Sequence, residues 1–297
     1  MKILLTGAQG QVGSALLPLL EPLGPVTALG RDALDLADSE AIRATVRAHR
    51  PQVIINAAAY TAVDRAESEP DLARAVNGMA PGVLAEAAGR LDGALIHYST
   101  DYVFDGSASH PYREDDPPHP LGVYGHSKWL GEQAVLASGT PALIFRTSWV
   151  YSLHGANFLK TMLRLGCERD HLRVVHDQWG APTWAGAIAQ ATVAILRQAE
   201  ASGDVTGFIR QHRGVYHMTN GGATTWCDFA RAIFALRPEC TARVEPIPAS
   251  EYPSPVRRPV NSRLDNAKLA RHFQYALPSW QEALAQCLAG LPPASQP

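Results

Sequence analysis

The amino-acid sequence predicts an α/β fold organised around a doubly wound parallel sheet. Short apolar runs alternate with helical patterns through the first half of the chain, and the connections between them are short. The first apolar run also ends in a glycine-rich turn that leads into a helix. Ligands of such sheets bind at the carboxyl ends of the strands, so the residues that follow each strand are the first candidates for a functional site.

Length, composition and charge limit the class of protein. The chain has 297 residues, 46% of them hydrophobic, which is enough for one large domain or two modest ones. There are 26 basic and 28 acidic residues, giving a formal net charge of -2. We therefore expect neither a nucleic-acid partner nor attraction to an anionic membrane.

The pattern of cysteines and apolar runs indicates a soluble cytoplasmic protein. Four cysteines are scattered without a C-x-x-C pair, which is typical of free thiols in a reducing compartment. No apolar run approaches the roughly 18 residues that a membrane helix needs. The histidines lack the spacing of known zinc sites, so no metal site is expected.

The first strand and its turn have the pattern of a dinucleotide site. Lys2–Thr6 is a short apolar run, and Gly7, Gly10 and Gly13 follow it before a helical pattern begins. Backbone N–H groups at such a helix start can approach a pyrophosphate where side chains would block it, as in Rossmann folds. The first glycine gap is one residue longer than in the usual fingerprint, so tight packing of the turn is the alternative interpretation.

The second strand, Val26–Leu29, is followed by residues that bear on cofactor choice. Arg31 favours NADPH, because an arginine at this position can pair with the 2′-phosphate of the adenosine ribose. Asp32 is the kind of residue that binds the ribose hydroxyls of NADH, so NADH remains possible. A solvated surface pair is the alternative.

The sheet continues with three further predicted strands. Two helical segments separate these strands: a helix through about His49 with Ser39 as its predicted N-cap, and a helix-rich stretch over 63–90. Asn77 in the second segment is interpreted as ordering a water or a backbone bulge, or as exposed. The small residues Ala57–Ala59 at a strand end leave room for a flat ligand. The predicted strands are Gln52–Asn56, Ala94–Tyr98 and Ala142–Arg146.

The alternation of strands and helices becomes less regular after residue 149, and we expect a smaller mixed α/β lobe there. Residues 1–149 are predicted to form the nucleotide-binding domain, and 150–297 mainly a substrate-binding lobe. Whether later segments such as 215–236 rejoin the sheet is left open. A proline cluster over 246–259 predicts a loop, and a helix is predicted over 264–288.

The fourth predicted strand ends in hydroxyl residues, and a helix with a phenol and an amine follows it. Ser99 and Thr100 lie at that strand end, and Tyr124 and Lys128 follow at i and i+4, on one face of a helix. A nearby ammonium favours the ionised form of a phenol, so we expect Lys128 to lower the pKa of Tyr124 towards neutrality. A Tyr-x-x-x-Lys pair alone is also common on surface helices.

Together with the glycine turn, this constellation resembles the extended short-chain dehydrogenase/reductase superfamily. Six ordered segments go further and resemble the dTDP-4-dehydrorhamnose reductase family, over nearly the whole chain from Lys2 to about Leu269. These segments are Ile55–Ala59, His97–Phe104, Phe145–Tyr151, Asp177–Thr183, Thr224–Trp226 and Arg258–Leu264.

The resemblance implies NADPH-dependent reduction of the C4 keto group of dTDP-4-dehydro-6-deoxy-L-mannose to dTDP-L-rhamnose. It implies Tyr124 as the general acid, Lys128 as the residue that lowers its pKa and binds the nicotinamide ribose, and Thr100 as the donor that polarises the carbonyl. The implied cofactor residues are Gly7, Gly10, Gln11, Val12, Gly13, Arg31, Asp35, Leu36, Ala57, Ala58, Ala59, Tyr60, Thr61, Tyr124 and Lys128. The implied substrate residues are Thr100, Asp101, Tyr124, Trp149, Asn157 and Arg258.

Alternatives and departures from the family pattern stay open. A nucleotide-sugar epimerase or dehydratase of the same superfamily is one alternative. A non-catalytic NADP-binding subunit like that of methionine adenosyltransferase is another. Ser14 and Ala15 stand where some members carry a magnesium-binding glutamate at a dimer contact, so the chain could be a monomer or a homodimer.

Overall fold

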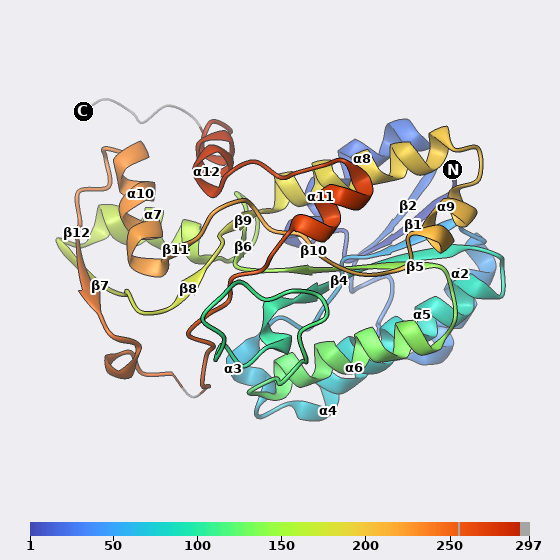
Figure 1. Ribbon diagram of the computed structural model, residues 1–297, viewed down its shortest axis with the longest axis horizontal. Helices are drawn as coiled ribbons and strands as arrows, with labels where there is room; N and C mark the ends of the chain where they lie inside the picture. Colours follow the sequence, from blue (N-terminus) through green and yellow to red (C-terminus); the bar gives the residue numbers. More distant parts are fainter. Residues whose placement is uncertain (255, 292–297) are drawn as a thin grey trace.

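A six-stranded parallel sheet forms the larger part of the molecule (Figure 1), a computed structural model that describes residues 1–254 and 256–291. The strand order is β10-β5-β4-β3-β1-β2, and every pairing is parallel. The predicted parallel sheet is therefore confirmed. The strands are β1 (Ile3–Thr6), β2 (Val26–Leu29), β3 (Val53–Asn56), β4 (Ala94–Thr100), β5 (Ala142–Thr147) and β10 (Gly214–His217).

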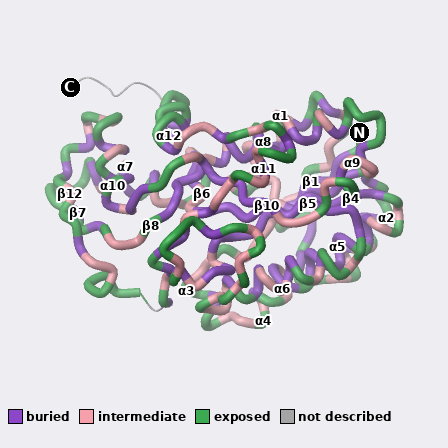
Figure 2. Tube along the Cα trace, viewed as in Figure 1, coloured by how far each residue is buried: buried purple, intermediate pink, exposed green. Residues whose placement is uncertain are grey.

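Helices cover both faces of this sheet, which is why its central strands read as continuous apolar runs. Figure 2 shows the strands buried between helices with exposed outer faces. One face packs on α1 (Gln11–Leu20), α8 (Ala185–Ala201), α9 (Val205–Gln211) and α11 (Ala267–Phe273). The other packs on α2 (Ser39–His49), α5 (Ala80–Gly89) and α6 (Val123–Ala137).

The chain order reverses between β1 and β3, and this switch point brings two loops together. Gly7 follows β1 with φ 70°, a left-handed conformation that suits glycine. A Cβ on Gly7 would lie 2.5 Å from the backbone nitrogen of Ala58, which follows β3. The first glycine is therefore required by the close approach of the two strand ends.

Element boundaries differ from the predictions in places with identifiable causes. The N-cap of α2 is Asp38 rather than Ser39, because its carboxylate accepts from the backbone N–H groups of Glu40 and Ala41. The stretch over 63–90 is broken into α3 (Val63–Ala66), α4 (Pro70–Ala73), a π-helical segment η2 (Arg74–Met79) and α5.

The predicted helix over 264–288 is wrong, since two shorter helices occupy this range. The first, α11, ends before Gln274, whose φ of 49° is left-handed. The second, α12 (Trp280–Leu288), starts at a capping box between Ser279 and Glu282. A left-handed residue and a new N-cap interrupt what reads as one helical pattern.

A second lobe packs beyond the carboxyl ends of the large sheet, on the left in Figure 1. Its helices α7 (Phe158–Glu168), α10 (Trp226–Leu236) and α12 enclose an aromatic core that includes Tyr151, Phe229 and Trp280. Its strand pairs are β7 (His171–Val175) with β12 (Arg243–Ile247), β6 (Val150–Tyr151) with β9 (Thr183–Trp184), and β8 (Trp179–Gly180) with β11 (Thr224–Thr225).

The chain passes between the two parts more than once. After β9 it returns along α8 to the large sheet, adds β10 to the sheet edge, and goes back to the second lobe at β11. Short 3-10 turns, η1 (Glu21–Leu23), η3 (Asp101–Val103) and η4 (Ala249–Glu251), complete the described structure. Within this described part, no helix is long and apolar enough to cross a membrane.

Replacing Gly131 by alanine tests the close packing of α6, the helix that carries Tyr124 and Lys128. A Cβ at this position would lie 2.1 Å from the carbonyl oxygen of Asn77 in η2, so the helices must separate. We expect a loss of about 1–3 kcal/mol in the free energy of unfolding, measured by urea denaturation. Gly221→Ala is the control, because its nearest neighbour would be 3.7 Å away. Equal stability of the two variants would contradict the packing argument.

Candidate active site

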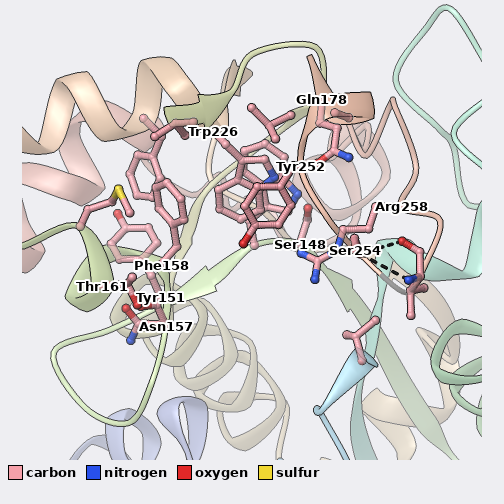
Figure 3. A pocket seen from close by; sticks show the side chains of 18 of the residues that line it. Ser148, Tyr151, Asn157, Phe158, Thr161, Gln178, Trp226, Tyr252, Ser254 and Arg258 are labelled. Atoms are coloured by element: carbon pink, nitrogen blue, oxygen red, sulfur yellow. Dashed lines mark hydrogen bonds between the residues drawn. The ribbon is translucent and has the colours of Figure 1, made fainter. Parts of the chain in front are cut away.

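A cavity of about 1430 Å³ opens between the carboxyl ends of the large sheet and the second lobe. Thr100, Asp101 and Tyr124 line it from the sheet side, and Trp149, Asn157 and Arg258 complete its wall. Figure 3 shows the side chains of Trp226, Tyr252 and Arg258 grouped around this space. All six predicted substrate residues are thus brought to one cavity.

Thr100 is placed by two local interactions at the last position of β4. Its hydroxyl accepts from the Tyr102 backbone N–H at 3.2 Å and donates to the Asp101 carboxylate at 3.0 Å. Tyr124 lies in the first turn of α6, which approaches η3 closely because Gly125 has no side chain. A Cβ on Gly125 would be 2.1 Å from the carbonyl oxygen of Tyr102.

The predicted effect of Lys128 on Tyr124 is wrong in this geometry. Burial raises the pKa of the Tyr124 phenol above its usual value, and the Thr100 hydroxyl only partly offsets this increase. Desolvation disfavours the phenolate more than any nearby positive charge favours it. Tyr124 is therefore a protonated phenol at neutral pH, which is the form a general acid needs.

Lys128 is buried, with 2% of its surface exposed. Its Nζ donates to the backbone carbonyl oxygen of Tyr98 at 2.6 Å and lies 3.4 Å from His97 Nε2. Burial lowers the pKa of Lys128 to about 8, although the Glu132 carboxylate acts in the opposite direction. The amine can thus change its charge within reach of neutral pH.

Several polar atoms face the cavity near Asp101 without a hydrogen-bond partner. Asp101 Oδ2 and the hydroxyls of Ser99, Thr147 and Ser148 belong to this group. Burial raises the pKa of Asp101 to about 6, and the neighbouring Ser262 and Thr100 hydroxyls partly oppose the shift. Buried polar groups without partners are costly, so this end of the cavity is suited to a polar ligand.

The glycine turn leaves the start of α1 open. Gly10 is the N-cap and offers no side-chain hydrogen bond, and no acidic residue occupies the first turn. A Cβ on Gly13 would lie 2.1 Å from the carbonyl oxygen of Gly7, so the third glycine is sterically required. Val12 packs partly into the core beneath the turn. The first backbone N–H groups of α1 have no partner within the helix and fit a dinucleotide pyrophosphate.

The Gln11 side chain links the glycine turn to the second lobe. Its Oε1 accepts from the Asn157 amide at 2.8 Å and from the Ser152 hydroxyl at 3.2 Å. The same Asn157 amide also donates to the Ser152 carbonyl oxygen at 2.8 Å, while its Oδ1 caps α7. Asn157 therefore joins the two lobes as well as lining the cavity.

The other residues predicted to bind the cofactor lie along the ends of β2 and β3. Arg31 and Asp35 are exposed, whereas the Leu36 side chain is buried in the core and offers a ligand only its backbone. Ala57, Ala58, Ala59 and Tyr60 are half-buried and Thr61 lines the cavity. The Tyr60 hydroxyl donates to Glu69 at 2.6 Å, and this bond raises the pKa of Tyr60.

Asn77 is a site residue whose role the sequence did not define. It is buried in the π-helical segment η2, the backbone bulge that was one of its three interpretations. Its Oδ1 accepts from the Tyr60 N–H at 2.8 Å, and its Nδ2 donates to the Tyr60 carbonyl oxygen and the Ser127 hydroxyl. Asn77 therefore fixes the loop after β3 against α6, and π-bulges are frequent at functional sites.

The whole-chain comparisons decide the family. The family model described as "RmlD substrate binding domain" matches residues 1–292. A dTDP-4-dehydrorhamnose reductase from Burkholderia thailandensis is 49% identical over 98% of this chain and 99% of its own length. The reductase of Escherichia coli K12 is 43% identical over 97% of each chain. This chain belongs to the dTDP-4-dehydrorhamnose reductase family.

Solved structures of the reductase family agree with this assignment. The Clostridium acetobutylicum member is 36% identical, with a TM-score of 0.90 over 97% of this chain and 99% of that chain. The Bacillus anthracis reductase, solved in complex with NADP, is 34% identical, with a TM-score of 0.88 over 98% and 100% of the two chains. The family resemblance seen in the sequence motifs is confirmed.

Two aromatic residues form the wall of the reductase cavity in the second lobe. Trp149 stacks on Trp226 with ring centroids 3.5 Å apart and planes at 10°. Its backbone has φ 49°, a left-handed conformation that bulky residues rarely adopt. Gly180 makes room for the ring, since a Cβ there would lie 2.4 Å from Trp149 Cε2. Trp226 was noted only within the Thr224–Trp226 segment, and its contact with Trp149 is long-range.

Arg258 lies on the cavity wall with its charge already paired. Its guanidinium Nη2 donates to both carboxylate oxygens of Asp64 at 3.3 Å. The neighbouring Arg257 also lines the cavity and is exposed. An anionic ligand would therefore meet two guanidinium groups, one of which is shared with Asp64.

Replacing Asp101 by asparagine should remove a pH-dependent loss in the free energy of unfolding. The folded-state pKa of Asp101, about 6, lies above its ordinary value of 3.8, so its contribution to stability is lost as pH rises between these values. The cost at neutral pH is about 3 kcal/mol. Asp101→Asn should match the parent near pH 4 and be the more stable of the two near pH 7, by urea denaturation at each pH.

Asp105→Asn is the matched control for this experiment. The expected change in the free energy of unfolding at neutral pH has the opposite sign. The backbone N–H of Ser107 lowers the pKa of Asp105, so this carboxylate stabilises the fold above its unfolded pKa. The control variant should therefore lose stability at neutral pH. An Asp101→Asn stability difference that does not change with pH would contradict the assignment.

Proposed function

We propose that the chain reduces the C4 keto group of dTDP-4-dehydro-6-deoxy-L-mannose to give dTDP-L-rhamnose, with NADPH as reductant and Thr100, Tyr124 and Lys128 as the catalytic residues. The convergence of these three residues at the carboxyl end of β4 carries the residue assignment. Thr100 and Tyr124 line the cavity, and Lys128 is buried behind them.

The chemistry requires a hydride and a proton, and the protein supplies the proton. A bound reduced nicotinamide supplies the hydride when the cofactor is in place. Thr100 would turn its hydroxyl proton from Asp101 to the ketone oxygen, where the donated hydrogen bond stabilises the negative charge that develops. Tyr124, kept protonated by burial, gives its proton to that oxygen.

Separate parts of the site would hold the two ligands. The residues of the glycine turn and of the loop after β3 fit NADPH, with Arg31 placed to meet the 2′-phosphate. We propose that the sugar lies between Asp101 and the Trp149–Trp226 stack, and that Arg258 pairs with the diphosphate in competition with Asp64. Residues 1–149 would then bind mainly cofactor and 150–297 mainly substrate.

The two alternative functions find less support. Dehydratases of this superfamily usually carry a second acid beside the catalytic threonine, but Asp101 is followed by Tyr102. A non-catalytic NADP-binding subunit would not need Thr100, Tyr124 and Lys128 together. We further propose a cytoplasmic location, since Cys167, Cys227, Cys240 and Cys287 are free thiols. The monomer and the homodimer can be distinguished by light scattering.

The Tyr124→Phe variant tests both the reaction and the acid. Purified protein, NADPH and enzymatically generated dTDP-4-dehydro-6-deoxy-L-mannose are mixed, and the absorbance of the reduced cofactor is followed. The parent should consume NADPH, and Tyr124→Phe should lose at least about a hundredfold in turnover while still binding NADPH. Tyr98→Phe is the control, because the Tyr98 hydroxyl bonds to Thr192, away from the cavity. Lack of NADPH consumption by the parent would reject the function, and unchanged turnover in Tyr124→Phe would reject the acid.

Arg31→Ala tests the choice of cofactor. Loss of a charge-assisted contact to the 2′-phosphate should raise the KM for NADPH about tenfold and leave the KM for NADH nearly unchanged. Arg47→Ala is the control, since Arg47 is also exposed but lies on α2, away from the end of β2. Equal effects of Arg31→Ala on the two cofactors would refute a contact with the 2′-phosphate.

A further inference from the structure

A chain of four buried side chains runs beneath the site from β1 to α6. Thr6, Asn56, His97 and Lys128 come from β1, β3, β4 and α6, and each is at most 2% exposed. The Thr6 hydroxyl donates to Asn56 Oδ1 at 2.7 Å, and Asn56 Nδ2 lies 3.1 Å from His97 Nδ1. The His97 Nε2 then faces Lys128 Nζ at 3.4 Å. His97 is therefore the side chain of this chain that contacts the buried Lys128 amine.

A backbone N–H fixes the orientation of the Asn56 amide. The Ala58 N–H points at Asn56 Oδ1 at 3.3 Å, and a backbone N–H can only donate. A rotation of the amide by half a turn would set the Asn56 NH₂ against this N–H group. The Nδ2 donor of Asn56 is thus held towards His97.

The orientation of Asn56 decides which nitrogen of His97 carries the proton. Since His97 Nδ1 faces a donor, it must present its lone pair, and the proton of a neutral ring must be on Nε2. Burial and the Lys128 charge hold the pKa of His97 well below its usual value, so the ring is neutral. An Nε2–H group therefore points at the Lys128 amine.

An Nε2–H donor beside Lys128 distinguishes the two charge states of the amine. A neutral amine can accept from this N–H while it donates to the Tyr98 carbonyl oxygen. An ammonium has no lone pair, so the same contact becomes donor against donor. The arrangement consequently stabilises the neutral form of Lys128.

Other titratable groups near Lys128 do not provide the same stabilisation of its neutral form. Glu132 lies one turn further along α6, but Arg146 of β5 binds its carboxylate at 2.9 and 2.6 Å. Tyr124 precedes Lys128 by one turn on the same face, and Asp101 lies close enough to raise the pKa of Tyr124. Of the titratable side chains named here, His97 contacts the Lys128 amine directly.

We propose that His97 is a positioning residue, locked as the Nε2–H tautomer, that stabilises neutral Lys128 and so lets Lys128 return a proton to the Tyr124 phenolate in each turnover. The inference rests on the proposed reduction. The ketone gains a hydride from the reduced nicotinamide and a proton from Tyr124 Oη. The phenolate takes a proton from the Lys128 ammonium, and solvent then reprotonates the neutral amine.

Nuclear magnetic resonance can test whether His97 is held as the Nε2–H tautomer, and this measurement does not depend on catalytic activity. In ¹⁵N-histidine-labelled protein, His97 should show the Nε2–H tautomer, with its signals assigned by their loss in His97→Leu. The chain contains only Lys2, Lys128, Lys160 and Lys268, so the ¹⁵Nζ titration of Lys128 can be followed. Loss of one hydrogen bond to the neutral amine should raise its midpoint by about one pH unit in His97→Leu.

Asn56→Asp provides a second variant that keeps the histidine. A carboxylate at this position accepts from His97 Nδ1–H, so the ring should change tautomer and the Lys128 midpoint should rise. His217→Leu is the control, because it removes another buried histidine whose low pKa of about 3 keeps it neutral. The control should leave the Lys128 midpoint unchanged.

The pH profile of turnover provides the functional readout. Turnover should fall as pH rises through the pKa of Lys128, about 8, because the ammonium is lost. In His97→Leu this alkaline limb should move up by about one pH unit. An Nδ1–H tautomer, or an unchanged Lys128 midpoint in His97→Leu, would overturn the inference even in an active enzyme. An inactive parent whose Lys128 midpoint still responds to His97 would overturn the proposed function alone.

Discussion

The burial of the Lys128 amine beneath the end of β4 is the constraint on which the rest of the site depends. Removing an amine from water is costly unless hydrogen bonds replace the lost ones, and the Tyr98 carbonyl oxygen supplies one at 2.6 Å. This requires α6 to pack closely on its neighbours. Gly125 permits its approach to η3 at the end of β4, and Gly131 permits its approach to η2, because neither has a side chain. The same approach places Tyr124 on the cavity wall, so packing and the proposed catalysis share one geometry.

Much of the large sheet could be predicted from sequence, because its strands are buried on both faces and read as apolar runs. The end of β4 was predicted two residues early, since Ser99 and Thr100 are polar although they continue the strand. Thr100 and Tyr124 could be proposed from sequence because their signals are local: a strand end and an i, i+4 pair. The structure places both on the cavity wall. The glycine turn was recognised for the same reason.

Features set by long-range contacts could not be predicted in this way. The pKa of Tyr124 depends on how deeply the folded chain buries it, and the sequence suggested only the nearby charge of Lys128. The π-helical turn at Asn77 follows from hydrogen bonds to Tyr60 and Ser127, and the latter lies 50 residues away. Helix propensity over 264–288 likewise could not show that the backbone of Gln274 adopts a left-handed conformation.

The contacts between the lobes indicate that neither lobe forms the site alone. Gln11, the first residue of α1, is bound to Asn157 of the second lobe, and Arg258 is bound to Asp64 of the α3 segment. One contact lies beside the glycine turn and the other at the cavity wall. A ligand that displaces Asp64 from Arg258 must break one of these links and replace it with its own charge. If the substrate binds Arg258 as proposed, its binding is coupled to the relative position of the lobes through the same guanidinium group.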